Sequence, residues 1–403
     1  MSASKLWQAG AASTDAVIEH YTVGDDHQLD QQLLPYDLMA SRAHAAMLHH
    51  MDILSLEEWK KTQDGLDAIH QLWKTGQFVI RPDQEDGHTA IEQYLTAHYG
   101  EVGQKIHTGR SRNDQALVML RLYMKDHLLS AAILIEAVAE AARARADATD
   151  DIPMPGYTHM QPAMPTTVGR WLRGYADGWA DAALLARRTL PLIDQNPLGS
   201  ASGFGIEPLP LDRAFTTEML GFERTQESVH YCGLSRGWME VICLQALQPA
   251  MMLAGRFAQD MLLFTSAAYN FFALPERFTT GSSIMPQKRN YDLFELMRAR
   301  VRRLEACVQE IHGIVGSLPG GYQRDLQRTK PCLMEGMQVV EESMQVLQRV
   351  LPEITVHPNH LNAAMTPDIY RTDAVYQLVR EGVPFREAYQ RVKKEGRQGN
   401  GPA

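Results

Sequence analysis

The stretch QALVMLRLYMKDHLLSAAILIEAVAEAARARADA (residues 115–148) decides the fold, because it contains neither proline nor glycine. Its apolar side chains recur at steps of three or four residues, which is the spacing of one face of an α-helix. They are Leu117, Leu120, Met124, Leu128, Ala131, Ile135 and Val138. At about 1.5 Å per residue, the stretch predicts a helix roughly 50 Å long. Such a helix needs partners to cover its apolar face.

Four more segments show the same spacing, and together they predict an all-α protein with a central bundle of long helices. They are residues 168–190, 234–272, 292–315 and 331–351, and Pro249 is expected to kink the second. Several of these helices carry Ala, Met and Leu on more than one face, which is more apolar surface than a single bundle can bury. We therefore expect several copies to associate as a homo-oligomer.

The bundle divides the chain into three predicted domains. Residues 1–110 show shorter helical patterns separated by turns, and residues 111–352 contain the long helices. Residues 353–403 predict a small helical domain with one helix near 373–380 and another near 385–393. The alternation typical of strands is nearly absent.

Composition excludes several classes of protein. The 403 residues include 39 Lys and Arg against 48 Asp and Glu, a formal charge of −9 that disfavours nucleic acid as a partner. The four cysteines form no CxxC pair, so we expect a reducing cytoplasm rather than a disulfide framework. The most apolar stretch, residues 241–263, is interrupted by Gln245, Pro249 and Asp260, and we expect no membrane segment.

Four polar segments interrupt the helical pattern and are the places to look for function. They are HTGRSRNDQ (107–115), GYTHMQ (156–161), GSSIMPQKRN (281–290) and YQRDLQRTK (322–330). The third places two hydroxyls and Lys288 just before a helix expected to begin at Asn290, its candidate N-cap. Helix N-termini and cations attract anions, so this loop predicts an anion site.

These four segments resemble a known family. The sequence GSSIMPQKRN is similar to the signature loop of the fumarase/aspartase superfamily, and the other three segments resemble argininosuccinate lyases in the same order. Lys5-Leu6-Trp7 and residues 382–386 (GVPFR) also match, so the resemblance covers nearly the whole chain. The resemblance implies a three-domain all-α fold whose central helices assemble into a homotetramer, with each active site built from loops of three subunits.

The resemblance also implies an activity, the reversible elimination of fumarate from argininosuccinate to give arginine. The chemical difficulty is the carbanion formed next to a carboxylate, which preorganised cations and donors must stabilise. Ser282 is the implied base and Lys288 stabilises the negative charge, although Ser283 remains an alternative base. His159, held by Glu295, is implied to serve the leaving nitrogen, and whether it is the general acid remains open.

The remaining implied site residues divide between the two halves of the substrate. The succinate half is assigned to Ser111, Arg112, Asn113, Arg236 and Asn290, and the arginine half to Asp30, Tyr322, Gln327 and Lys330. Thr158 is placed at a substrate carboxylate. His88 and Gln161 are second-rank candidates. Departures from the family pattern occur at Tyr291, at residues 226–236 and in the short tail.

Local alternatives compete with some of these assignments. Thr89 and Glu92 have capping-box spacing, which by itself would explain the residues around His88 as a helix start. Residues 199–205 (GSASGFG) are glycine-rich, but no strand precedes them, so we expect a turn lining the pocket rather than a dinucleotide loop. No metal and no cofactor are expected. Another lyase acting on a different N-substituted aspartate, or a crystallin-like structural protein, remains possible from sequence.

Overall fold

The computed structural model describes residues 15–398, which form two compact units. The first unit comprises the residues up to Ala132 together with Leu185–Gln248 and Arg303–Val339. The second comprises Ile133–Leu184, Pro249–Arg302 and the residues from Val340 onward. The Lys5-Leu6-Trp7 motif lies outside the described residues.

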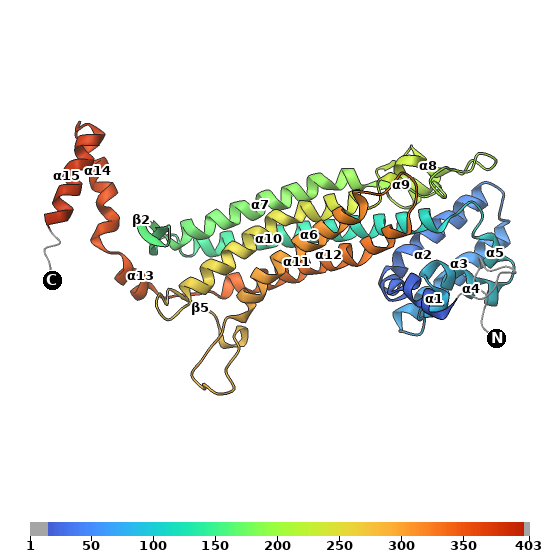
Figure 1. The fold of residues 1–403 in the computed structure, drawn as a ribbon, viewed down its shortest axis with the longest axis horizontal. Helices are drawn as coiled ribbons and strands as arrows, with labels where there is room; N and C mark the ends of the chain where they lie inside the picture. The colour runs from blue at the N-terminus through green and yellow to red at the C-terminus, as the bar shows by residue number, and fades with distance from the viewer. Residues whose placement is uncertain (1–14, 399–403) are drawn as a thin grey trace. The chain divides into compact units, whose positions relative to one another are not determined.

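The five predicted long helices are present, and the predicted all-α fold is confirmed (Figure 1). They are α6 (Arg112–Asp147), α7 (Val168–Ile193), α10 (Trp238–Phe264), α11 (Asp292–Val315) and α12 (Thr329–Val350). Four of the five predicted ranges agree with the observed bounds to within three residues. Each long helix contributes residues to both units.

Large aromatic side chains and small residues pack these helices within each unit. In the second unit, Trp171 of α7 stacks on Phe257 of α10, with ring centroids 5.8 Å apart. The fully buried Trp179 donates its Nε1 hydrogen to the carbonyl of Ala250 at 3.2 Å. In the first unit, a Cβ on Gly336 of α12 would lie 2.7 Å from the Leu244 side chain of α10, so a larger residue here would have to displace Leu244.

The predicted helix over 234–272 is wrong at both ends. Gly237, with φ +81°, separates the short helix α9 (Val229–Leu234) from α10. A Cβ on Gly237 would lie 2.1 Å from Val315, so both the conformation and the space require glycine. At the other end the chain leaves the helix after Phe264, and β5 (Phe272–Ala273) pairs with β6 (Thr355–Val356).

Helix α10 is long and apolar enough to cross a membrane if only length and composition are considered. However, 56% of its most apolar window is buried inside the protein. Burial of this extent is typical of a core helix, which passes the same test.

Short strands were nearly absent from the predictions, but three two-stranded sheets occur among the described residues. The longest is an antiparallel hairpin of β1 (Pro153–Thr158) and β2 (Gln161–Thr167), and the prolines in both strands hide its alternation. Its two-residue turn has φ values of +53° and +62° at His159 and Met160, as in a type I′ turn. The parallel pair β3 (Gln195–Asn196) and β4 (Arg224–Thr225) lies in the first unit.

The N-terminal helices surround an apolar core in the first unit. They are α1 (Ala16–Val23), α2 (Asp26–His50), α3 (Leu56–Lys74), η1 (Pro82–Gln84), α4 (Gly87–Tyr99) and α5 (Val102–Lys105). Leu34, Leu38, Leu66, Ile69 and Ile91 belong to this core. The predicted capping box of Thr89 and Glu92 is wrong, because α4 begins at Gly87 and its N-cap is Asp86. The Asp86 carboxylate accepts both the backbone N–H and the hydroxyl of Thr89 at 2.8 Å.

The remaining elements are short. They are α8 (Arg213–Met219), η2 (Glu276–Phe278), η3 (Arg324–Arg328), η4 (Leu351–Glu353), α13 (Pro358–Ala364), η5 (Pro367–Tyr370), α14 (Arg371–Arg380) and α15 (Phe385–Gln398). The two predicted tail helices are confirmed as α14 and α15, which enclose a small core of Val375, Ala388 and Val392.

Candidate active site

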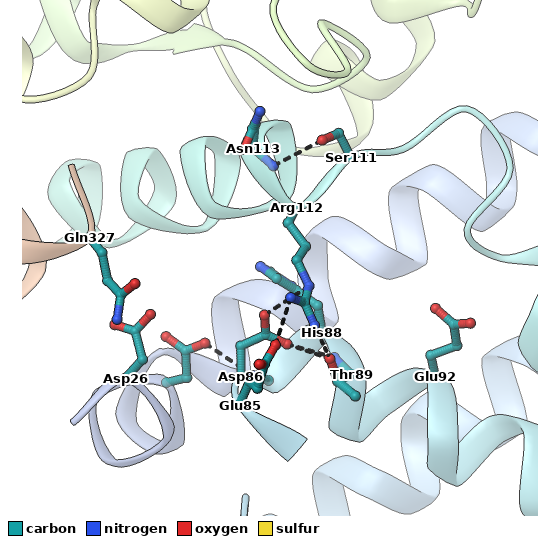
Figure 2. A network of polar contacts seen from close by, with 12 residues as sticks. Asp26, Glu85, Asp86, His88, Thr89, Glu92, Ser111, Arg112, Asn113 and Gln327 are labelled. Atoms are coloured by element: carbon teal, nitrogen blue, oxygen red, sulfur yellow. Dashed lines mark hydrogen bonds and ion pairs between the residues drawn. The ribbon is translucent and has the colours of Figure 1, made fainter. Parts of the chain in front are cut away.

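A cavity of about 160 Å³ in the first unit collects charged side chains from five separate parts of the chain. Its charged lining residues are Asp26, Asp30, Glu85, Asp86, Arg112, Arg236, Arg324 and Lys330. His88, Asn113, Tyr322 and Gln327 complete its polar lining. Seven of the residues predicted for the substrate therefore meet here, together with His88, and Figure 2 shows several of them in one network.

Lys330 at the start of α12 is buried between two carboxylates of α2. Its Nζ lies 2.7 Å from Asp30 Oδ1 and 3.1 Å from Asp26 Oδ1. Burial alone would lower the pKa of Lys330, but these carboxylates raise it, so the ammonium stays charged. Burial opposes ionisation of Asp30 as well, yet Lys330 and His88 hold its pKa below the ordinary value. Burial raises the pKa of Asp26, so the two carboxylates differ in acidity.

Arg112, in the first turn of α6, is held by the segment before α4. Its Nη1 lies 2.8 Å from Glu85 Oε2, its Nε lies 3.2 Å from Asp86 Oδ2, and its Nη2 donates to the Thr89 hydroxyl at 2.7 Å (Figure 2). Three contacts fix the plane of the guanidinium before any ligand binds. A preorganised guanidinium is well suited to a carboxylate.

Ser111 and Asp114 shape the beginning of α6. The Ser111 hydroxyl accepts the backbone N–H of Asn113 at 3.3 Å, while Asp114 Oδ1 accepts the backbone N–H of Ser111 at 2.9 Å. The other carboxylate oxygen of Asp114 accepts the N–H groups of Gly199 and Ala201 at 3.0 and 3.1 Å. Asp114 is fully buried and therefore ties the helix end to the 199–205 turn, a role that its position in the first turn did not reveal.

The 199–205 turn lines a second cavity of about 180 Å³, as the sequence predicted. Ala201, Ser202, Gly203 and Phe204 supply one wall, and Leu117, Leu234 and Leu326 make the lining largely apolar. Asn113, Arg236 and Tyr322 line both cavities, so the apolar and the charged cavity adjoin at these three residues.

Arg236 is already engaged by the protein. Its Nη2 donates to the Leu326 carbonyl at 3.1 Å, and its Nε lies 3.8 Å from Glu240 Oε1. Glu240 in turn accepts the backbone N–H of Gly237 at 2.7 Å. The guanidinium, only 5% exposed, thus links the start of α10 to η3 while forming part of both cavity walls.

Gln327 contacts the end of α1. Its Nε2 donates to the carbonyls of Thr22 and Val23 at 3.3 and 3.0 Å, and Arg324 also donates to Thr22 at 2.8 Å. Arg324 was not predicted as a site residue, and neither were Asp26, Glu85 and Asp86. Two signals could have found the acids: Asp26 lies one helical turn before Asp30, and Glu85 and Asp86 directly precede His88.

The signature loop lies in the second unit, between η2 and α11. Ser282 is half-buried, and its hydroxyl oxygen accepts the backbone N–H groups of Ile284 and Met285 at 3.3 and 3.1 Å. Ser283 and Lys288 are exposed on the same loop. The predicted N-cap role of Asn290 is wrong, because α11 begins at Asp292 and Asn290 instead forms a bridge with Thr280.

The hairpin residues also lie in the second unit. Thr158 faces Gln161 across the turn, and His159 occupies the turn itself. Glu295 lies in the first turn of α11 and is exposed, as is His159. No hydrogen bond or ion pair joins His159 to Glu295 within the described residues of this one chain. Within residues 15–398, no group of three His, Cys, Asp or Glu side chains could hold a metal ion.

The fold of long helices is of the fumarase/aspartase type. A family model described as "Lyase" matches residues 5–304. The argininosuccinate lyase of Stenotrophomonas maltophilia is 46% identical over 96% of this chain and 89% of its own length. The chain therefore belongs to the lyase family that includes the argininosuccinate lyases.

Two solved structures agree with this assignment at the level of the fold. The crystal structure of EDDS lyase in complex with formate has a TM-score of 0.80 and 25% identity, covering 95% of this chain and 76% of that one. The class II fumarase of Schistosoma mansoni has a TM-score of 0.77 and 14% identity, covering 93% of this chain and 91% of its own. The expected fumarase/aspartase-like fold is thus confirmed.

Proposed function

We propose that this chain cleaves argininosuccinate reversibly to arginine and fumarate, the last step of arginine biosynthesis. The observation that carries the proposal is the charged cavity, where Asp30, Arg112, Gln327 and Lys330 meet from distant parts of a chain that is 46% identical to an argininosuccinate lyase. A ligand with an ammonium group and several carboxylates matches this set of fixed cations and anions. We place the enzyme in the cytoplasm and expect no cofactor.

The arginine half would bind at the buried pair of Lys330 and Asp30. Because Lys330 already contacts two carboxylates, its main effect is to keep Asp30 ionised and fixed in position for a substrate ammonium. Tyr322, which is 40% exposed, is available for the neighbouring carboxylate, and the Gln327 amide would turn to it from the carbonyls of Thr22 and Val23. The adjoining apolar cavity has room for the methylene chain.

The succinate half would bind to Arg112 and to the donors around it, Ser111 and Asn113. Arg112 is held rigidly by Glu85 and Asp86. Its remaining N–H groups can therefore bind a substrate carboxylate without further loss of side-chain entropy. Asn290 is assigned to the same half, Arg236 contributes positive charge from the cavity wall, and Thr158 is assigned to a substrate carboxylate.

Proton removal is assigned to Ser282. Two backbone N–H groups already point at its hydroxyl oxygen, and such donors favour the alkoxide over the alcohol. The alkoxide would take the proton from the carbon next to a succinyl carboxylate, and Lys288 would stabilise the charge that spreads onto the carboxylate oxygens. His159, held by Glu295, would then protonate the departing guanidino nitrogen. Ser283 is the alternative base on the same loop.

We also propose a homotetramer with shared active sites and the three-domain division given above. The long helices expose apolar side chains that a single copy leaves in water. They include Leu129, Ile133, Leu184, Leu185, Leu192, Met252, Leu296 and Val346. Leu296 and Val346 border a groove of about 470 Å³ on α11 and α12 that a helix of another copy could fill. Sedimentation at micromolar concentration should show four copies, and a monomer would contradict the proposal.

A direct assay tests the function. Purified protein mixed with argininosuccinate should release fumarate, measured by its ultraviolet absorbance. Turnover of another succinyl adduct but not of argininosuccinate would favour a different lyase of the family.

The variant Ser282→Ala tests the assigned base and the crystallin-like alternative. It should lower kcat by several orders of magnitude while the assembly and the thermal midpoint remain unchanged. Ser283→Ala is the matched control, because Ser283 is the exposed neighbour on the same loop. A loss only in Ser283→Ala would transfer the role of base to that residue, and no turnover by the unchanged protein would support a structural function.

A further inference from the structure

His88 lies in the wall of the charged cavity and is held from behind by one carboxylate. It occupies the first turn of α4, and its Nδ1 lies 2.6 Å from Oδ2 of Asp37 on α2. Both side chains are buried, with 6% and 1% of their surfaces exposed. Since Nδ1 faces Asp37, Nε2 is the ring nitrogen left for a ligand in the cavity.

A second buried cation sits behind Asp37. Arg110 Nη2 lies 3.8 Å from Asp37 Oδ1, and Arg110 Nη1 donates to the Ser41 hydroxyl at 3.0 Å. Ser41 also donates to Asp37 Oδ1 at 3.4 Å. Arg110 and Ser41 therefore contact one oxygen of Asp37 and leave the other for His88. Asp37 and Arg110 offset each other in charge, so a proton on His88 would add a net positive charge to the site.

The charge of the cavity makes that proton important. Four acidic and four basic side chains line the cavity, so without His88 their formal charges cancel. A substrate with one ammonium, one guanidinium and three carboxylates has a net charge of −1. Protonated His88 would give the cavity the single positive charge that matches this ligand.

We propose that Asp37 is a positioning residue that holds His88 as an imidazolium whose Nε2–H donates to a substrate carboxylate in the charged cavity. This inference rests on the proposed function. Asp37 itself lines neither cavity, so it acts only through His88.

The electrostatic surroundings support a charged ring. Burial opposes the proton on His88, but Asp37 first, and then Asp86 and Asp30, raise its pKa above the ordinary value. The other charged or titratable groups nearby are His107, Arg110, Arg112 and Lys330. Since a raised pKa keeps the proton at higher pH, the imidazolium form, and with it substrate binding, should be lost as pH rises through this raised pKa.

The first experiment compares kcat/KM for argininosuccinate between about pH 6 and about pH 9 in the full-length protein, Asp37→Asn and His88→Gln. Asparagine keeps the shape and an acceptor for Nδ1–H but removes the charge. The alkaline limb of the profile is the fall of kcat/KM at high pH. In Asp37→Asn this limb should move to lower pH, so that kcat/KM falls about tenfold near pH 8 and less than about threefold near pH 6. His88→Gln should lack this limb, and the double variant should be no worse than His88→Gln. Equal losses at every pH, or additive losses in the double variant, would overturn the proposal.

Asp260→Asn is the matched control. Asp260 is a part-buried carboxylate that accepts from Trp171 and Tyr175 at 3.0 and 2.7 Å and lines neither cavity. It should lower the thermal midpoint without moving the pH profile. A shift of the alkaline limb in Asp260→Asn equal to that in Asp37→Asn would show that the limb reports general destabilisation, and the proposal would fail.

A second readout does not depend on the reaction. The His88–Asp37 pair should contribute to folding fully below about pH 6.5, the ordinary pKa of histidine, and lose this contribution as pH rises through the raised pKa. Urea unfolding of the unchanged protein and of His88→Gln should therefore show a stability difference that shrinks above that pH. A difference that does not shrink would overturn the inference. Absence of fumarate release by the unchanged protein would instead overturn the proposed function, so the two failures are distinguishable.

Discussion

Lys330 Nζ lies 2.7 Å from Asp30 Oδ1, although the two residues are 300 positions apart in the chain. The contact connects the start of α12 to the first turns of α2, and it is buried on both sides. A buried ion pair stabilises a fold only while both partners are present, because removing one leaves an uncompensated charge.

Lys330→Met should therefore destabilise the protein by about 3 to 5 kcal/mol, since Asp30 and Asp26 would then face each other without a cation. Chemical unfolding measures the change. The matched control is Lys61→Met, because Lys61 pairs with Glu57 at 2.8 Å on the exposed face of α3. Solvent screens an exposed pair of this kind, so its removal should change stability little. Equal effects of the two substitutions would contradict the buried role of Lys330.

Asp30 and Asp26 should respond to pH in opposite directions. The pKa of Asp30 is lowered in the folded state, so its contribution to stability is present above about pH 3.9 and is lost as pH falls through the folded pKa. The pKa of Asp26 is raised, so its ionisation weakens folding as pH rises. Asp30→Asn should lower the free energy of unfolding more near neutral pH than in acid. Near neutral pH, Asp26→Asn should lower it less than Asp30→Asn does. Urea midpoints across the acid range measure both, and parallel curves would refute the assignment.

The sequence predicted the long helices because their periodicity is local, and the bounds of α11 were predicted without error. It also predicted, through the resemblance, seven of the residues that line the charged cavity. The pairing of Lys330 with Asp26 could not be predicted, since no local pattern connects α12 to α2. The glutamate and aspartate before α4 were missed because acids before a helix are usually caps, and Asp86 does serve as the N-cap while also holding Arg112. Asn290 was misassigned because its long-range bridge with Thr280 replaces the local capping role.

Asp114→Asn should loosen the 199–205 turn. The substitution replaces one oxygen of a buried carboxylate that accepts three backbone N–H groups, so one bond is lost and an amide group is left without an acceptor. The expected cost is about 1 to 3 kcal/mol. Hydrogen exchange measured by mass spectrometry should speed up in peptides containing Gly199 and Ala201. Asp212→Asn, at the N-cap of α8, is the control, and unchanged exchange at the turn in Asp114→Asn would contradict the anchoring role.

Met160→Gly should stabilise the β1–β2 hairpin. Met160 has φ +62° and is 61% exposed. Glycine would therefore relieve the strain of the left-handed backbone conformation with little loss of buried apolar surface. The expected gain is about 0.5 to 1 kcal/mol, partly offset by the greater entropy of glycine in the unfolded chain. Differential scanning calorimetry should show a higher midpoint. Met164→Gly, which is in strand β2 and also exposed, should lower it, and the same sign for both would contradict the turn geometry.

Mixing two inactive variants should restore part of the activity if each active site draws on several copies. Ser282→Ala removes the assigned base in the second unit, and Arg112→Gln removes a substrate cation in the first. When the two variants are unfolded together and reassembled, some sites of a mixed tetramer would receive Ser282 from one chain and Arg112 from another, both intact. Fumarate release above that of either variant alone is the expected result, and each variant reassembled by itself is the control. If both residues of a site came from the same chain, every site would carry one of the two substitutions, and the mixture would remain inactive.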